Sequence, residues 1–485
     1  MTTLLANPEL IRNVRAQLRW GRVLTAAVVC VLLSLAVGFS MAYEHRGTSQ
    51  PHAWGLEFFN IVVLAQVVVL LMGGGVACLH AVQREKDTNT FDFQRITRLA
   101  PLELALGKLL GAPATSYFVV LCLMPAALVG AIVGRVQPSV VLSIYVVLVL
   151  GSICFHALAL LISLLVERGA ASAAVLLFLV LVGMTSTGNS PFMNLGMLSP
   201  FAAPELIEQT TVDVFFGWRV HHVFVLVVLY LAFTGWFLLA VARNIKRDPA
   251  VYELFTPMQA LGFALYVNLV LVGFFRWKAL APLDDQVVML TLNTMLFFVL
   301  GLALLRNRDR LRRLREAGGG DPGWAAATWP APYLITGTLL VGLAVVAIHS
   351  GRDPGAQWDP GLAIFRVVLF SLWLARDVLY LQWMNLRRSR HPVVLGAVFL
   401  AVFYACAAIL FAALGLFGTP KGLAFTALFV PAAALGVQPE TWSAHLEFWF
   451  LGLVVQVVAA GVFVVLQRRK LAELSTRTTP DAAVV

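Results

Sequence analysis

The chain contains long, uninterrupted apolar runs, and these runs restrict what it can fold into. Each run is about 20 residues long, the length that an α-helix needs to cross about 30 Å of hydrocarbon. They are continuously apolar and do not alternate as the strands of a transmembrane barrel do. Only 12% of the 485 residues are charged, about half of the roughly 25% typical of soluble proteins. We therefore predict an all-α polytopic membrane protein.

Lysine and arginine predict the orientation of the spans, because cytoplasmic loops carry an excess of both. With a cytoplasmic N-terminus, 26 of the 35 basic residues fall in cytoplasmic segments and 7 in outer loops. This bias predicts that both termini are cytoplasmic and that the protein lies in the plasma membrane, which is the inner membrane if the source is a bacterium. The twelve predicted spans cover residues 23–42, 58–80, 109–134, 139–166, 170–187, 222–242, 259–275, 285–305, 331–349, 362–385, 393–416 and 446–466.

The spacing of the spans indicates an internal repeat of two six-helix halves, residues 1–247 and 248–485. A nearly constant offset between corresponding spans is the signature of such a repeat. Each half has an apolar, proline-broken outer segment before its last span, at 191–207 and 420–437. These segments are too short to span, so we predict that they re-enter the membrane from outside. Their predicted outer-gate residues are Pro200, Phe201, Pro204 and Pro431.

The first long cytoplasmic loop, residues 83–111, carries the most informative motif. A charged cluster from Arg84 to Asp87 is followed by capping-type residues at 88–90. Phe91 and Phe93 then place aromatic side chains in an otherwise polar loop. This pattern predicts a short surface helix that is suited to docking a soluble partner.

The loop resembles the one between the second and third spans of type-2 ABC transporter permeases. That family opens its third span with Leu-Gly-Lys, and its amphipathic N-terminal helix resembles residues 7–19 here. The resemblance covers residues 1–247, whereas the loop at 306–330 lacks the motif, so the second half is a degenerate copy. The matching residues are Glu85, Lys86, Thr90, Phe91-Asp92-Phe93, Pro101 and Leu106-Gly107-Lys108.

The resemblance implies that the loop carries a coupling helix, which presses on an ATP-hydrolysing subunit. It implies two copies of an ABC ATPase per chain, with ATP and magnesium bound to that partner. The chain has no GxxxxGK[ST] sequence, so we expect no nucleotide site, no cofactor and no catalytic residues of its own. The residues implied in coupling are Arg84, Glu85, Lys86, Thr90 and Asp92.

Charges within a predicted span are a second candidate. Arg376 and Asp377 lie in the tenth span, and intramembrane charges are functional candidates by default. They form either an internally paired cluster or part of a substrate path. By contrast, Gly130 and Gly134 form a GxxxG pattern that predicts close helix packing.

Two function classes other than an exporter remain open. One is a polytopic membrane enzyme, such as a lipid-linked sugar transferase, and the other is an ATP-coupled scaffold that carries no solute. The five cysteines fall inside apolar runs, so we predict no metal site. The arginine-rich run at 306–315 predicts a positive-inside loop facing anionic lipid, not a nucleic-acid site.

Overall fold

The computed structural model describes most of the chain, with gaps. The described residues are 6–46, 52–165, 212–215, 218–247, 252–275, 293–302, 304–306, 311, 337–340, 342, 360–387, 392–416, 419–427, 429–430, 442–443 and 445–476.

The chain divides into two compact units, Met1–Leu254 and Phe255–Val485. The sequence placed the division after residue 247. The repeat itself, with six spans in each half, stays a prediction.

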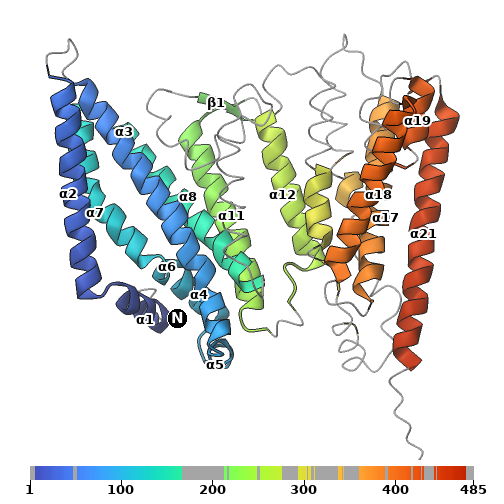
Figure 1. Cartoon of the computed structure of the whole chain (residues 1–485), viewed down its shortest axis with the longest axis horizontal. Helices are drawn as coiled ribbons and strands as arrows, with labels where there is room; N and C mark the ends of the chain where they lie inside the picture. The colour runs from blue at the N-terminus through green and yellow to red at the C-terminus, as the bar shows by residue number, and fades with distance from the viewer. Residues whose placement is uncertain are drawn as a thin grey trace, which may run out of the picture. The chain divides into compact units, whose positions relative to one another are not determined.

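The first unit is built from antiparallel helices (Figure 1). Helix α3 packs on α7, α4 and α11 pack on α8, and α2 packs on α7. A core of apolar side chains from α3, α7, α8 and α11 lies between them. The helices are α1 (Pro8–Gln17), α2 (Trp20–Glu44), α3 (Ala53–Val68), α4 (Gly75–Asp87), α5 (Phe91–Arg95), α6 (Pro101–Gly111), α7 (Ala114–Val133), α8 (Pro138–Leu165) and α11 (His222–Asn244).

The second unit is helical in its described parts. Helix α17 packs against both α18 and α21, and α19 packs against α21. Phe365, Trp442 and Trp449 form an aromatic core there, with ring centroids between 4.5 and 6.1 Å apart. The helices are α12 (Pro257–Phe275), α17 (Pro360–Asn385), α18 (Pro392–Ala413), α19 (Pro420–Ala427) and α21 (Leu446–Thr476).

Among the described residues, seven helices are long and apolar enough to cross a membrane. This confirms a helical membrane protein, while the count of twelve spans stays a prediction. Predicted span 170–187 lies outside the described residues. The seven are Trp20–Glu44, Ala53–Asp87, Ala114–Val133, Pro138–Leu165, His222–Asn244, Pro392–Ala413 and Leu446–Glu473.

The structure adds one short element to the predicted helices. Strands β1 (Val212–Phe215) and β2 (Trp218–His221) form an antiparallel pair directly before α11. Apolar and polar residues alternate in β2, and valine and aromatic residues, which favour strands, occur in both. Each strand is only four residues long and lies directly before an apolar span, so the sequence did not indicate a hairpin here.

The third span begins later than predicted. Residues 101–111 form the separate helix α6, and α7 starts at Ala114. Pro113 lies between the two helices and has no backbone N–H to continue the ladder. The carbonyl of Leu109, which such an N–H would reach, instead faces the Cys78 thiol at 3.9 Å.

Close packing at Gly130 and Gly134 is confirmed. A Cβ at Gly134 would lie 2.6 Å from the Leu56 nitrogen, and one at Gly130 would lie 2.9 Å from the Phe59 nitrogen. Only glycine therefore allows α7 to approach the backbone of α3 at these two turns. The two helices form the centre of the first unit's core.

A π-helical turn, Val69–Gly74, joins α3 to α4 within one continuous span. Such a turn frees backbone groups from the α-helical ladder. His156 of α8 makes use of this, because its Nε2 lies 2.8 Å from the Leu70 carbonyl and its Nδ1 lies 2.9 Å from the Tyr117 hydroxyl. The buried imidazole is therefore satisfied on both nitrogens and fixes α8 to two neighbouring helices.

Candidate functional site

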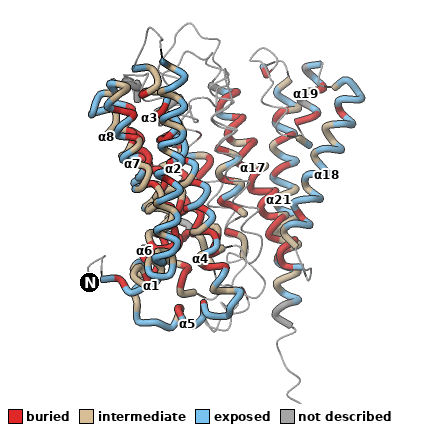
Figure 2. Tube along the Cα trace, turned by 60° about the vertical axis from the view of Figure 1, so that its left-hand side comes forward, coloured by how far each residue is buried: buried red, intermediate tan, exposed pale blue. Residues whose placement is uncertain are grey.

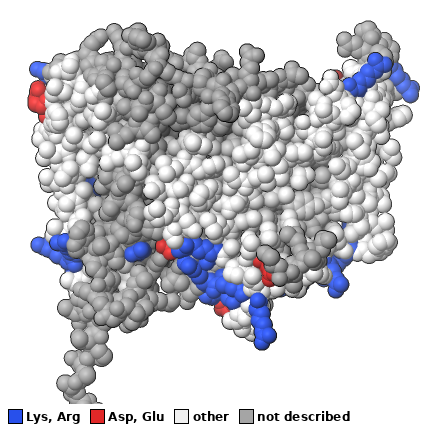
Figure 3. Space-filling model, turned by 180° about the vertical axis from the view of Figure 1, so that it is seen from behind, with Lys and Arg blue, Asp and Glu red and all other residues white. Residues whose placement is uncertain are grey.

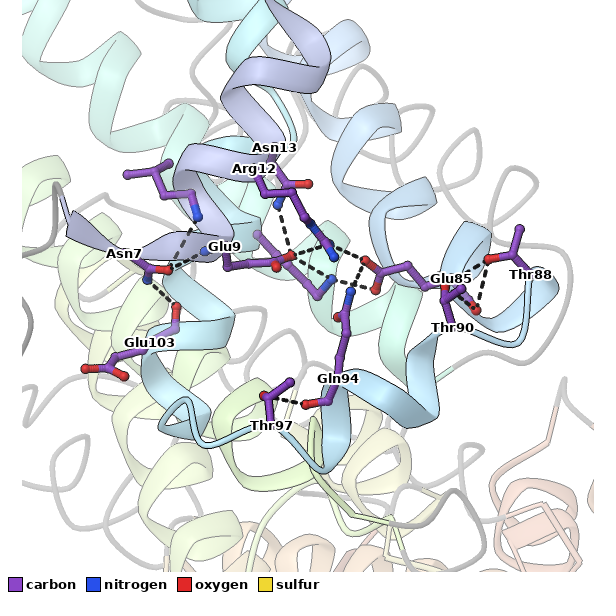
Figure 4. A network of polar contacts seen from close by, with 12 residues as sticks. Asn7, Glu9, Arg12, Asn13, Glu85, Thr88, Thr90, Gln94, Thr97 and Glu103 are labelled. Carbon is purple, nitrogen blue, oxygen red and sulfur yellow. Dashed lines mark hydrogen bonds and ion pairs between the residues drawn. The ribbon is translucent and has the colours of Figure 1, made fainter.

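A buried ion cluster lies at the end of the first unit where α1, α4 and α6 meet (Figure 4). Lys108 of α6 is only 1% exposed, and its Nζ lies 3.1 Å from Glu9 Oε1 and 2.5 Å from Glu85 Oε2. Arg12 Nη2 lies 2.8 Å from one oxygen of each carboxylate. Two cations thus face two carboxylates, and because the Arg12 side chain is 53% exposed, the pairing mainly offsets the desolvation of the buried Lys108 and Glu9.

Helix α1 reaches the cluster because α6 has glycines where the two helices meet. A Cβ at Gly107 would lie 2.7 Å from Glu9 Cβ, and one at Gly111 would lie 2.7 Å from Asn13 Cβ. These glycines are four residues apart and therefore share one face of α6. Close approach of α1 brings Glu9 onto Lys108.

Asn7 fixes the start of α1. Its side-chain oxygen accepts from the backbone nitrogens of Glu9 and Leu10, which is the N-cap arrangement. Its amide nitrogen donates to the Glu103 carbonyl at 2.6 Å. One buried side chain therefore both begins α1 and ties it to α6.

The segment from the last turn of α4 to the start of α6, residues 84–100, is anchored by two adjacent residues of α4. Glu85 accepts from Gln94 Nε2 at 2.5 Å, in addition to its contacts in the ion cluster. Lys86 Nζ donates to the Leu164 carbonyl at 2.7 Å, in the last turn of α8. A cation at a helix C-terminus is favourable. The adjacent side chains thus hold the segment to α1 and α6 and to the end of α8.

The threonines of this segment close α4. Thr88 Oγ1 donates to the Arg84 carbonyl at 2.9 Å, and Thr90 Oγ1 donates to the Glu85 carbonyl at 3.4 Å. Thr90 is the N-cap residue of α5, yet its side chain makes no hydrogen bond to the backbone of that helix. These capping-type residues therefore satisfy carbonyls at the C-terminus of α4.

A further contact joins the segment to the end of α11. Lys246 Nζ donates to the Thr97 carbonyl at 2.7 Å. Asn244, which is fully buried, exchanges two bonds with the backbone of Glu253, at 2.8 and 2.9 Å. The stretch that leads out of the first unit is thereby held beside α5.

Helix α5 presents an exposed surface on its other side. Phe93 is 71% exposed and Ile96 is 81% exposed, whereas Phe91 is buried. Asp92 is 80% exposed beside them, and Arg84 and Arg98 are also exposed. Two large apolar side chains within a charged rim are typical of a site that binds another protein. We call Arg84, Asp92, Phe93, Ile96 and Arg98 the α5 surface.

The five residues predicted for coupling thus have two different placements. Arg84, Thr90 and Asp92 are exposed, while Glu85 and Lys86 contact other helices of this chain. Glu9, Arg12 and Ile96 also belong to the site, although no sequence motif marks them. Glu9 and Lys108 are charged residues beside apolar runs, which marks each of them as unusual. Nothing in the sequence indicates that the two form an ion pair.

Arg376 and Asp377 lie together in a buried network of the second unit. Arg376 Nη2 lies 2.6 Å from Asp377 Oδ1, and its Nη1 donates to Gln456 at 2.7 Å. The Tyr404 hydroxyl donates to Asp377 Oδ2 at 2.7 Å. Arg376 and Trp373 also contact that hydroxyl. The network joins α17, α18 and α21 and pairs the charges internally, as one of the two hypotheses expected.

The predicted outer gate falls on residues that the structure does not describe, namely Pro200, Phe201, Pro204 and Pro431. No protein-family model, curated protein or solved structure gives a match to this chain.

Proposed function

We propose that this chain is the membrane subunit of an ATP-driven ABC transporter, an exporter that works with a separate ATPase subunit. The observation that carries the proposal is the α5 surface. Its Phe93 and Ile96 are exposed, while Glu85 and Lys86 of the same segment are bonded to other helices. A partner that pushed on Phe93 and Ile96 would push on a segment joined to α1, α6 and α8 through Glu85 and Lys86. Resemblance of residues 83–111 to the coupling segment of type-2 permeases supports the same role.

The contacts of Glu85 change which residues should touch the partner. Glu85 is engaged with Lys108, Arg12 and Gln94, so we assign it to positioning the segment. Phe93 and Ile96 are assigned to the interface, because exposed aromatic and aliphatic anchors supply most of the binding energy at such sites. ATP and magnesium would bind to the partner, with two ATPase copies per chain.

The test compares purified variants for ATPase stimulation in nanodiscs. Phe93→Ser with Ile96→Ser should reduce stimulation by about tenfold or more, since losing one buried anchor costs roughly 2 kcal/mol. The control is Ile132→Ser, because Ile132 is 76% exposed near the other end of α7. Thermal unfolding of all variants should be unchanged. Full stimulation by the double variant would refute the α5 surface as the docking site.

The same preparation separates the other function classes. If no ATPase co-purifies with the chain, a membrane enzyme is favoured over a transporter. Association with an ATPase but no ATP-dependent movement of solute in vesicles would favour a scaffold. An exporter requires both association and movement, with ATP supplied on the side of α5.

A further inference from the structure

Three arginines at the corner between α1 and α2 have no ion-pair partner among the residues that the structure describes. Arg15 lies in the last turn of α1, Arg19 precedes α2, and Arg22 lies in its first turn. All three are exposed. Arg12, on the same short helix, is by contrast paired with Glu9 and Glu85. The corner therefore carries three unneutralised positive charges.

An apolar surface begins at the same corner. Trp20 is 81% exposed and Leu24 is 54% exposed. Only 6% of the apolar window of α2 is buried within the protein (Figure 2), although one side of the helix packs on α3 and α7, and its exposed apolar face is suited to contact with lipid. Tryptophan at the first turn of such a helix is typical of the level of the lipid headgroups.

The position of the corner agrees with that level. Figure 1 shows α1 running across the lower end of α2. On the right-hand side of Figure 3, where the first unit lies, the visible Lys and Arg side chains gather mostly along the lower edge of an uncharged surface. Phosphate groups of lipids lie at the edge of such a surface, and guanidinium groups match phosphate oxygens in bidentate geometry.

We propose that Arg15, Arg19 and Arg22 form a binding site for the phosphate headgroups of anionic phospholipids, with Trp20 and the exposed face of α2 against their acyl chains. The bound lipid would cover the face of α1 that does not pack on α6. It would thereby hold α1 in the position from which Glu9 reaches Lys108. The proposal does not depend on the transport function.

The test measures thermal unfolding of the whole chain in neutral detergent with added lipid. Phosphatidylglycerol should raise the unfolding midpoint more than phosphatidylcholine at equal concentration. Changing Arg15, Arg19 and Arg22 together to Gln should lower the affinity for phosphatidylglycerol on the order of 100-fold, from about 1 kcal/mol per basic residue. Changing all three to Lys should retain part of the effect, because the charge remains while the bidentate geometry is lost.

The matched control removes charge just after the C-terminal ends of α2 and of its neighbour α7. Arg46→Gln with Arg135→Asn should leave the phosphatidylglycerol effect unchanged, and Asn suits Arg135 because its φ is 56°. In the unaltered protein the effect should shrink as salt is raised. A salt-independent effect, or an equal effect of phosphatidylcholine, would overturn the proposal. An equal effect of inorganic phosphate would overturn it in favour of a soluble anion.

Discussion

Lys108 Nζ lies 2.5 Å from Glu85 Oε2, and this contact joins the acidic residue of the α4–α6 segment to the helix that precedes the third span. The lysine is 1% exposed and also holds Glu9 of α1. Three helices that are far apart in sequence therefore depend on one ammonium group. The same lysine belongs to the Leu-Gly-Lys motif, so this motif residue pairs with carboxylates of its own chain.

The first prediction concerns this lysine. Lys108→Met leaves two carboxylates with only Arg12 to neutralise them, so we expect it to destabilise the protein by about 3–5 kcal/mol. Adding Glu9→Gln and Glu85→Gln should recover much of the loss, because no buried charge then lacks a partner. Thermal unfolding in detergent measures both. Lys470→Met is the control, since Lys470 pairs with Glu473 at the surface and such pairs contribute about 0–1 kcal/mol.

The second prediction concerns the approach of α1 to α6. Gly107→Ala should displace α1, because its Cβ would lie 2.7 Å from Glu9 Cβ. The expected result is faster proteolysis after Arg12 and a lower unfolding midpoint. Gly235→Ala in α11 is the matched control, because a Cβ there meets nothing within 4 Å and alanine favours a helix by about 1 kcal/mol. Equal behaviour of the two variants would contradict the proposed packing role.

A third prediction concerns the second unit. Arg376→Met alone should destabilise that unit by about 3–5 kcal/mol, because Asp377 would remain buried without its cation. Arg376→Met combined with Asp377→Leu should be less destabilising than the single change. A substrate-path role predicts the reverse ranking in function, with transport lost in the double variant even where the fold is retained. Unfolding and vesicle transport, measured on the same samples, distinguish the two roles.

The fourth prediction concerns the described part of the second outer segment. Phe429 contacts the rings of Phe411 and Phe425, at 5.5 and 5.8 Å between centroids. Phe429 is 39% exposed, and in a segment that re-enters the membrane this apolar surface faces lipid, so a cysteine at Phe429 should react slowly with a membrane-impermeant thiol reagent. Lys421→Cys is the control, because Lys421 is exposed on α19 and should react quickly. Rapid reaction at both positions would indicate an ordinary water-exposed loop.

Sequence patterns predicted the helical membrane character because a continuous apolar run has few alternatives to a span. They also predicted the tight packing at Gly130 and Gly134, since GxxxG spacing is local. The same spacing occurs at Gly107 and Gly111, where it brings α1 close to α6. The break at Pro113 was likewise readable but was overridden by the apolar residues around it.

Pairings between distant residues were beyond the sequence. Glu9 and Lys108 are 99 residues apart, and no periodicity relates them. Glu85 was assigned to the surface because it lies in a charged loop, but burial depends on which helix covers it. Phe93 is exposed and Phe91 is buried because of how the short helix α5 is rotated about its axis. Composition does not predict that rotation.

The separation of Glu9 from Lys108 has a consequence for how the protein is made. A ribosome adds about 5–20 residues each second, so Glu9 waits roughly 5–20 s for Lys108 to be synthesised. During that time α2, α3 and α4, which lie between the two residues in the sequence, are synthesised. Arg12 is available from the start, because it lies one turn from Glu9 on α1 and pairs with it at 2.8 Å. It can neutralise the carboxylate at the membrane surface until the permanent partner arrives, so α1 need not enter the hydrocarbon or leave the bilayer while it waits.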